Sequence, residues 1–375
     1  MLRIMHLVPY FAVHEMPGGI DVHVYELAKY LLKEGFEPII YASITKESRF
    51  VVEREDLQNK NIYVRRFPAI ELSTFPLFPK RGYPLPITSF SEIIRECDVL
   101  HIHGQEFLTG FVASLKAKRL DIPIVLTIHN PGWTLEDYPF VKIIRKVFYK
   151  TIFSTTINSA EKIIIPTMSD FPILQYLTHK KIVRIPHCID LERFDNLKKE
   201  PKYVLYLGRL EPVKGVQYFV RAIPIILKKV DVNFIIAGHG SLESSLRKFI
   251  RSKGIEDHVT FLGRASYGDV PRILAKASVF VAPGGAGLTL LEAAASRTPI
   301  VTVDNPWNLS MVDSNSVLVV KEGDIKGLAS GITMLLLDKN LAENLSNKAR
   351  RFIEEKRSWS SSIKQYISIY KEAMR

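Results

Sequence analysis

Short apolar strands alternate with amphipathic helical segments along nearly the whole chain of 375 residues. Near the start, residues 4–8 and 38–42 have the composition of buried strands, and residues 22–33 between them carry apolar side chains at helical spacing. This alternation predicts parallel strands joined by helices that cover both faces of a sheet. Because 375 residues exceed the usual size of one hydrophobic core, we expect an α/β protein with two doubly wound, Rossmann-like domains.

A charged segment at residues 189–200 interrupts the alternation, so we place the linker there and expect domains at residues 1–195 and 196–357. In the first half we expect further strands at 62–68, 98–102, 124–128, 162–166 and 182–186, a surface loop at 70–86, and helices at 106–118 and 141–153. In the second half we expect strands at 203–207, 232–237, 259–261, 279–282, 300–303 and 316–319. The helices expected there are 216–229, 242–253, 270–275, 288–296, 325–337, 341–355 and a final one at 358–374.

Composition limits the classes of partner. Residues 1–196 carry 24 Lys/Arg against 22 Asp/Glu, whereas residues 197–375 carry 27 against 17, and such a basic half suits an anionic ligand. The chain has no known nucleic-acid-binding motif, so we expect no nucleic-acid partner. Cys97 and Cys188 are too few for a disulfide framework, no signal peptide is evident, and no apolar run reaches ~18 residues, so we expect a cytoplasmic protein.

A glycine-rich turn precedes the helix expected at 288–296, in the stretch VAPGGAGLTLLEAAASRTP. Gly285 and Gly287 let a ligand approach the main chain, and the first N–H groups of a helix attract an anion or a polarised sugar. Glu292 lies about one turn into this helix. Two interpretations stay open: a strand–helix connection with Glu292 in a structural ion pair, or a ligand-binding turn.

Glycine and basic residues mark other strand ends of the second half. Gly208 and Arg209 directly follow an expected strand, and Lys214 precedes the next helix. A forked guanidinium and an ammonium in one turn suit a leaving diphosphate, and we favour this interpretation over a solvated basic loop. Weaker signals of the same kind follow two further strands: Gly238, Gly263 and Arg264.

Histidines mark strand ends of the first half. His101 and His103 end one expected strand and His129 ends another, so their side chains would point into a cleft at that edge of the sheet. No further metal ligand is evident beside them, and a hydrogen-bonded structural role is the alternative, although we favour a functional role for His129. Gly18 and Gly19 form either a close-approach loop or a plain turn. They do not form G-x-G-x-x-G, which argues against a nicotinamide-dependent oxidoreductase.

No Asp-x-Asp sequence occurs in the chain. That sequence is the usual carboxylate clamp for a metal ion on a nucleotide diphosphate. A diphosphate site in this chain would therefore rely on Arg, Lys and helix ends, with no metal ion.

The ordered set of motifs resembles the retaining glycosyltransferases of the GT-B fold, in the family called glycosyltransferase family 4 or glycosyl transferases group 1. The matching stretches are GGIDVHVYELAKYLLKEGFEP, DVLHIHG, IPIVLTIHN, RIPHCIDLERF, GRLEPVKGV, FIIAGHGSLESSL, VTFLGR and GAGLTLLEAAASRTPIV. The resemblance implies two Rossmann-like domains facing a cleft and a C-terminal helix, residues 358–375, that crosses back to the first domain. It also implies a metal-independent hexosyltransferase that uses a UDP- or GDP-linked sugar and no cofactor.

The resemblance implies roles for single residues as well. Arg209 and Lys214 would neutralise the leaving diphosphate, and His129 would lie near the transferred sugar. Glu292 would accept hydrogen bonds from the ribose hydroxyls. The residues implied in donor binding are Gly18, Gly19, Gly208, Gly238, Arg264, Gly285, Ala286, Gly287, Leu288 and Glu292. The acceptor would be a sugar or a lipid-linked group.

The chain departs from the family pattern at several positions. Gly284 stands where the family has the first of two glutamates, and the segment DNPWNLSMVD at 304–313 replaces a glycine loop and an acid. Gly284 leaves a second hypothesis open, namely a degenerate relative or partner subunit that binds a nucleotide sugar without catalysis. The basic segments at 80–86 and 141–153 suggest peripheral contact with the inner face of an acidic membrane, with a solvated basic face as the alternative.

Overall fold

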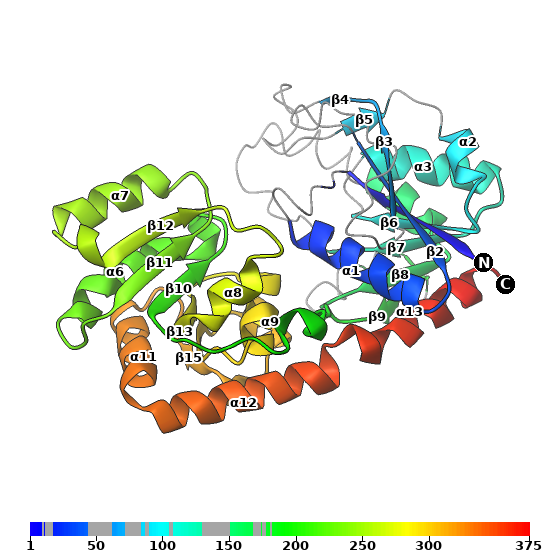
Figure 1. Ribbon diagram of the computed structural model, residues 1–375. Coiled ribbons are helices and arrows are strands. Elements are labelled where there is room, and N and C mark those ends of the chain that lie inside the picture. Colours follow the sequence, from blue (N-terminus) through cyan, green and yellow to red (C-terminus); the bar gives the residue numbers. More distant parts are fainter. Residues whose placement is uncertain are drawn as a thin grey trace. The chain divides into compact units, whose positions relative to one another are not determined.

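A computed structural model of the chain describes residues 1–9, 11, 18–43, 62–71, 84–86, 90–104, 108–129, 151–167, 174, 178–180 and 182–375. The chain divides into two compact units, each built on its own sheet (Figure 1). The first unit takes in the described residues of Met1–Ala12, Ile20–Pro186 and Ser362–Arg375, and the second those of Val13–Gly19 and His187–Ser361. The end of the chain thus belongs to the first unit.

Seven parallel strands form the sheet of the first unit, in the order β3-β2-β1-β6-β7-β8-β9. The strands are β1 Arg3–Val8, β2 Glu37–Ser43, β3 Tyr63–Phe67, β6 Val99–His103, β7 Ile124–Thr127, β8 Lys162–Ile165 and β9 Ile182–Arg184. The helices are α1 Gly19–Lys33, α2 Ser91–Ile94, α3 Leu108–Arg119 and most of α13 Trp359–Ala373, and residues 151–159 are also helical. The strand order reverses between β1 and β6, and parallel sheets bind ligands at such a point.

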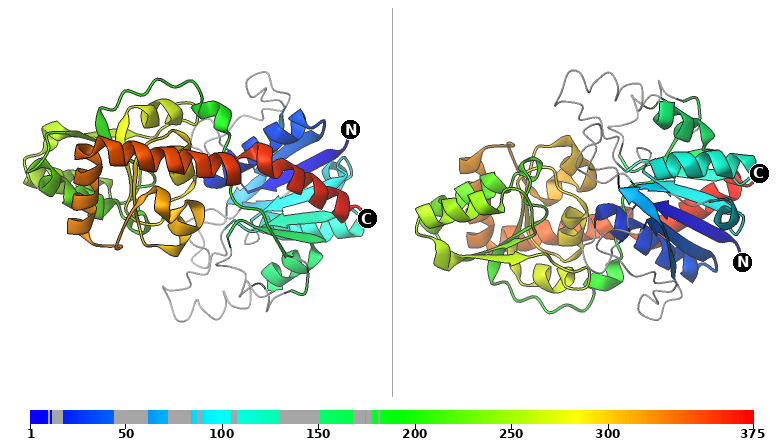
Figure 2. Two further views of the ribbon diagram at one scale, coloured as in Figure 1. Left: turned by 90° about the horizontal axis from the view of Figure 1, so that it is seen from below. Right: turned by 90° about the horizontal axis from the view of Figure 1, so that it is seen from above.

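The two faces of this sheet differ in chemistry. One face packs against α3 and the helix at 151–159 through the apolar strand residues Met5, Leu7, Leu100 and Ile102. Because side chains alternate along a strand, His6, His101 and His103 face the opposite side. There the ring of His101 contacts Tyr366 and Tyr370 of α13, which runs along this sheet (Figure 2).

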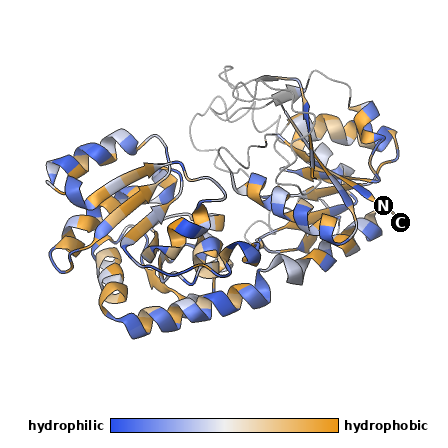
Figure 3. Ribbon diagram, viewed as in Figure 1, coloured by the Kyte–Doolittle hydropathy of each residue, from blue (hydrophilic) through white to orange (hydrophobic). Residues whose placement is uncertain are grey.

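Six parallel strands form the sheet of the second unit, in the order β12-β11-β10-β13-β14-β15. The strands are β10 Tyr203–Leu207, β11 Asn233–Ala237, β12 Val259–Gly263, β13 Ala277–Ala282, β14 Ile300–Val303 and β15 Leu318–Val320. The helices are α6 Val216–Leu227, α7 Glu243–Ser252, α8 Val270–Ala275, α9 Leu288–Ala295, α10 Pro306–Met311, α11 Ile325–Leu337 and α12 Lys339–Lys356. The strand order reverses between β10 and β13. Hydrophobic residues concentrate in these strands, whereas α12 is largely hydrophilic (Figure 3).

The predicted class of two doubly wound, parallel α/β domains is confirmed. The surface loop expected at 70–86 is partly wrong, because its ends pair as the antiparallel strands β4 Ala69–Glu71 and β5 Pro84–Pro86. Residues 80–83 and 141–150 of the basic segments lie outside the described residues. Within the described part of the chain, no helix is both long enough and apolar enough to cross a membrane.

Helix α10 was not expected from the sequence. It begins at Pro306, and the side chain of Asn305 caps it by accepting a hydrogen bond from the N–H of Trp307 at 2.9 Å. Asn at the cap and Pro at the first helical position are both start signals. The segment that departs from the family pattern therefore folds as a short capped helix.

Candidate functional site

The carboxyl ends of β10, β11 and β12 meet at glycines. The N–H of Gly208 donates a hydrogen bond to the carbonyl oxygen of Ala237 at 3.0 Å, and the N–H of Gly238 donates to that of Gly263 at 2.6 Å. A Cβ atom on Gly238 would lie 1.9 Å from the carbonyl oxygen of Gly208, and φ of Gly238 is +142°. Both facts require glycine at position 238. The structure thus brings the strand-end glycines together, and Arg264 follows them with an exposed side chain.

The turn after β10 contacts the glycine turn after β13. Nζ of Lys214 donates a hydrogen bond to the carbonyl oxygen of Gly285 at 2.7 Å, and the N–H of Gly285 donates to the carbonyl oxygen of Val213 at 3.1 Å. In the described part of the chain, no group accepts a hydrogen bond from the N–H of Gly287 or Leu288, where α9 begins. Such N–H groups beside an ammonium group have the chemistry that suits an anion.

Asn308 and Trp307 of α10 hold this glycine turn. Asn308 is fully buried, and its Oδ1 accepts a hydrogen bond from the N–H of Ala286 at 2.8 Å. Its Nδ2 donates to the carbonyl oxygen of Gly284 at 2.8 Å and to Oγ1 of Thr302 at 3.0 Å. Nε1 of Trp307 donates to the carbonyl oxygen of Ala286 at 2.6 Å. Ala286 was among the residues expected in donor binding, and its N–H is already bonded within the protein.

Sequence reasoning missed both of these α10 side chains. Their signal was present, since the segment 304–313 was recognised as a departure from the family pattern. Nothing in the sequence indicated, however, that the segment 304–313 bonds to residues 284–286.

Gly284 has no room for a side chain. A Cβ atom there would lie 2.7 Å from the backbone nitrogen of Gly215 and 2.7 Å from the carbonyl carbon of Lys214. These distances are far below van der Waals contact, and backbone atoms cannot yield as a flexible side chain can. Gly284, which replaces the family's glutamate, is thus required because the turn after β13 packs closely against the turn at Lys214 and Gly215.

Glu292 is buried and ion-paired. The residue lies in α9 and is 5% exposed. Nη1 of Arg193 donates a hydrogen bond to its Oε1 at 3.1 Å. Nη2 of Arg193 donates to the carbonyl oxygen of Tyr267 at 2.8 Å, and the guanidinium carbon lies 3.5 Å from the Tyr267 ring centroid. A buried carboxylate needs such a partner. The structural ion pair is therefore present, and a contact of Glu292 with ribose stays a prediction.

Arg209 lies in the same connection as Lys214, between β10 and α6. Its side chain is exposed, and its carbonyl oxygen accepts a hydrogen bond from the hydroxyl of Tyr206 at 2.7 Å. The structure therefore places both cations in one connection, and it joins Lys214 to the glycine turn through Gly285.

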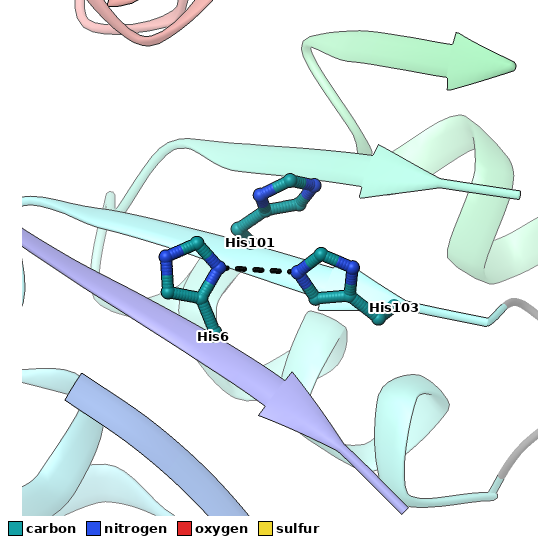
Figure 4. Close-up of side chains that lie close together, drawn as sticks. All are labelled: His6, His101 and His103. Carbon is teal, nitrogen blue, oxygen red and sulfur yellow. Dashed lines mark hydrogen bonds between the residues drawn. The ribbon is translucent and has the colours of Figure 1, made fainter. Parts of the chain in front are cut away.

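Histidines occupy the point of strand reversal in the first unit (Figure 4). His101 and His103 are 0% and 1% exposed, so the expectation that they point into an open cleft is wrong. Nδ1 of His101 is hydrogen-bonded to the hydroxyl of Tyr370 at 2.8 Å, and its Nε2 to Oγ1 of Thr127 at 2.7 Å. The alternative of a structural, hydrogen-bonded role is confirmed for His101.

His129 follows β7 and is 6% exposed, with Nε2 lying 3.1 Å from Nδ1 of His103. His6 of β1 and His23 of α1 also contact this cluster, and the sequence analysis singled out neither. Gly18 and Gly19 are exposed where α1 begins.

Burial keeps the rings of His6, His101 and His103 uncharged. Loss of hydration lowers the pKa of His6 to about 3. The same cause, reinforced by neighbouring histidines, lowers the pKa of His101 and of His103 well below the ordinary value of 6.5. His6, His101 and His103 are therefore neutral, hydrogen-bonded rings at pH 7.

Known proteins resemble the chain over both halves. Residues 17–193 match the family described as Glycosyltransferase Family 4, and residues 189–352 match the family described as Glycosyl transferases group 1. An uncharacterized glycosyltransferase of Methanocaldococcus jannaschii is 24% identical over 95% of this chain and 95% of its own. Sucrose-phosphate synthase from Thermosynechococcus elongatus shares the fold with a TM-score of 0.76 and 18% identity, over 99% of each chain. HepE of Anabaena, solved in complex with UDP and glucose, has a TM-score of 0.74 and 16% identity over 99% of this chain and 100% of its own.

Proposed function

Because the chain is a glycosyltransferase, with a first half of Glycosyltransferase Family 4 and a second half of the Glycosyl transferases group 1 family, we propose a specific reaction for it. It transfers a hexose from a UDP- or GDP-linked sugar to a hydroxyl of a sugar or lipid-linked acceptor. The anomeric configuration is retained, and no metal ion takes part. A lipid-linked acceptor would bring with it the peripheral membrane contact suggested by the basic segments.

The observation that carries this proposal is the contact between Lys214 and the glycine turn. The ammonium group lies 2.7 Å from the carbonyl oxygen of Gly285, two residues before the N–H groups at the start of α9. A diphosphate bound to those N–H groups would lie beside Lys214. Arg209 in the same turn would supply the second positive charge.

The reaction follows from this placement of charge. The bond between the anomeric carbon and the diphosphate oxygen breaks, and negative charge builds up on the diphosphate, where Lys214 and Arg209 stabilise it. A bond forms between the anomeric carbon and the acceptor oxygen. The acceptor proton passes to an oxygen of the departing diphosphate, so no protein side chain has to act as nucleophile.

Two further observations support the proposal. The fold is shared with a protein solved with UDP and glucose, which supports a nucleotide-sugar donor. The absence of Asp-x-Asp from the sequence supports binding of the diphosphate by cations and helix ends rather than through a carboxylate-held metal ion.

Slow hydrolysis of the sugar donor and transfer of its sugar to an acceptor can be followed together by proton NMR of the anomeric signals. The protein is incubated with UDP- and GDP-sugars, with and without simple sugar acceptors, in the presence of EDTA. We expect sugar release or transfer from one donor, with a first-formed product of the donor's own anomeric configuration. An inverted product, or turnover that requires added Mg²⁺ or Mn²⁺, would contradict the proposal. Binding of a nucleotide sugar without either reaction would support a binding module instead.

A further inference from the structure

A nearly buried arginine joins three segments of the second unit that are distant in sequence. Arg193 lies in the short 3₁₀ helix η2 Leu191–Phe194, within the charged segment at 189–200. Its guanidinium donates hydrogen bonds to Glu292 of α9 and to the carbonyl oxygen of Tyr267, in the connection after β12. The guanidinium carbon also lies 3.5 Å from the centroid of the Tyr267 ring. Because the guanidinium is planar, two bonds from different nitrogens and this ring contact fix its orientation.

The contact with Arg193 leaves half of the Glu292 carboxylate open. Nη1 of Arg193 donates to Oε1 at 3.1 Å, whereas no described residue donates a hydrogen bond to Oε2. The Glu292 side chain is 6% exposed, and Oε2 keeps part of that surface, since it is not one of the fully buried atoms without a partner. A carboxylate oxygen with so little access to water is stabilised by a donor that a ligand brings.

The position of Glu292 along α9 indicates which donor that is. Glu292 follows Leu288 by four residues, which is ~6 Å along the helix axis. A diphosphate bound at the start of α9 would therefore lie about one turn from the carboxylate. In a nucleoside diphosphate the ribose is attached directly to the diphosphate. Its hydroxyls are thus the donors that come within reach of Oε2.

We propose that Arg193 is a positioning residue that holds the Glu292 carboxylate with Oε2 directed at the ribose hydroxyls of the nucleotide donor. Arg193 does not touch the nucleotide in this arrangement and acts through Glu292. The site then selects ribonucleoside diphosphates over analogues without these hydroxyls, because such analogues leave Oε2 without a donor. The inference rests on the proposed function for its ligand, whereas the ion pair between Arg193 and Glu292 does not.

A purely structural tie between the charged segment and α9 is the competing interpretation. Arg350 of α12 is such a tie, at the other end of the same helix. It is 4% exposed, and it donates to the carbonyl oxygen of Ala295 at 2.6 Å and to Oδ1 of Asp195 at 2.7 Å. Since Ala295 is the last residue of α9, these contacts lie away from the start of the helix. Arg350 therefore provides a matched control for Arg193.

Isothermal titration measures the ribose contact as a ratio of two affinities. The probes are UDP or GDP, whichever binds the wild type more tightly, and its 2′,3′-dideoxy analogue. We expect the wild type to bind the ribonucleotide about 10- to 100-fold more tightly than the analogue, as hydrogen bonds to a charged group would give.

Two variants at position 193 change this ratio by different amounts. Arg193→Gln should lower it to about 1–3, because the carboxylate loses its partner and its fixed orientation. Arg193→Lys keeps a positive charge but loses the fork, so the ratio should fall at least about threefold. Arg350→Lys, the same change at the other tie, should leave the ratio unchanged.

Two further measurements show whether Arg193 acts through Glu292. Glu292→Gln should lower the ratio by itself, and Arg193→Lys added to it should lower the ratio no further, because both changes act on one contact. The preference for a diphosphate over a monophosphate depends on Lys214 instead. It should therefore stay unchanged in both Arg193 variants.

The outcomes separate this inference from the proposed function. A wild type that prefers the diphosphate but binds the dideoxy analogue equally well would overturn the ribose contact and leave the proposed function standing. A wild-type ratio in Arg193→Lys, or an equal fall in Arg350→Lys, would show a merely structural role. Arg193→Lys decides this even where Arg193→Gln fails to fold, since Glu292 keeps a cation beside it. A protein that binds neither UDP nor GDP would contradict the proposed function and this role of Arg193 together.

Discussion

The two sheets reverse their strand order at equivalent points and fill those points with opposite chemistry. In the first unit, β1 and β6 carry buried, uncharged histidines that bond to one another. In the second unit, β10 is followed by the turn that contains Lys214, and β13 by the glycine turn. Among the described residues, none accepts a hydrogen bond from the N–H groups of Gly287 and Leu288 at the end of this glycine turn. The shared topology fixes where a site is built, and the residues decide whether it offers neutral hydrogen bonds or positive charge.

A diphosphate requires positive potential, which Lys214 and the start of α9 supply in the second unit. Neutral imidazoles in the first unit supply uncharged hydrogen-bonding groups instead. Substitutions in either unit test this comparison. The expected effects range from a loss of turnover to a change in how steeply stability depends on pH.

The largest effect is expected from Lys214→Ala. Removing one positive group that faces charge developing in the transition state costs about 10²- to 10³-fold in kcat. Steady-state rates with the preferred donor measure this, together with a circular dichroism spectrum to show an intact fold. The control is Lys248→Ala on the exposed surface of α7, which should leave the rate unchanged. Turnover of Lys214→Ala close to that of the wild type would reject the role of Lys214.

Gly284→Ala should destabilise the protein by about 2–3 kcal/mol, since overpacking against backbone atoms strains both turns. The midpoint of urea unfolding measures this change. Gly268→Ala is the control, because a Cβ atom at Gly268 meets no atom within 4 Å. Equal midpoints for the two variants would mean that the turns at Lys214 and Gly284 separate at little cost.

Asn308→Ala should cost about 2 kcal/mol of stability, because it leaves the N–H of Ala286 and the carbonyl oxygen of Gly284 without their partner. It should also raise the donor KM, since α10 no longer holds the turn. The exposed Asn315, changed to Ala, is the control and should be within about 0.5 kcal/mol of the wild type. An unchanged donor KM in Asn308→Ala would show that donor binding does not depend on how α10 holds the glycine turn.

Acid should destabilise the protein through its buried histidines. Burial lowers the pKa of His6 to about 3 and that of His187 to about 4, below the ~6.5 of an unfolded chain. The unfolded chain therefore binds more protons at acid pH, so this contribution to stability is complete above pH ~6.5 and is lost as the pH falls below it. His6→Asn should make stability fall less steeply between roughly pH 6 and 4.5, by ~1.4 kcal/mol per pH unit.

Unfolding midpoints at a series of pH values measure this slope. The exposed His179, changed to Asn, is the control. A slope in His6→Asn as steep as in the wild type would contradict the neutral, buried state of this ring.

The fold and the strand-end residues could be predicted because their signals are local. An apolar strand followed by a turn that contains glycine or a cation marks Gly208, Lys214 and residues 285–288 without reference to the rest of the chain. The partners of these residues could not be predicted, because they come from distant segments. The bonded pairs are Ala286 with Asn308, Glu292 with Arg193, and His6 with His103, which are 22, 99 and 97 residues apart.

Physical reasons underlie that limit. Which side chains meet depends on strand order and rotamers, and neither is fixed by the alternation of strands and helices alone. Gly284 is an example, since its departure from the family pattern was visible in the sequence but its cause, the backbone of Lys214 and Gly215, was not.

The central claim is that the second unit binds a diphosphate with Lys214 and the start of α9. Isothermal titration in EDTA compares UDP with UMP and GDP with GMP, in the wild type and in Lys214→Ala. We expect one diphosphate to bind the wild type at least about tenfold more tightly than its monophosphate, and this ratio to fall towards one in the variant. Equal affinity for the diphosphate and the monophosphate, or a ratio that Lys214→Ala leaves unchanged, would contradict the claim.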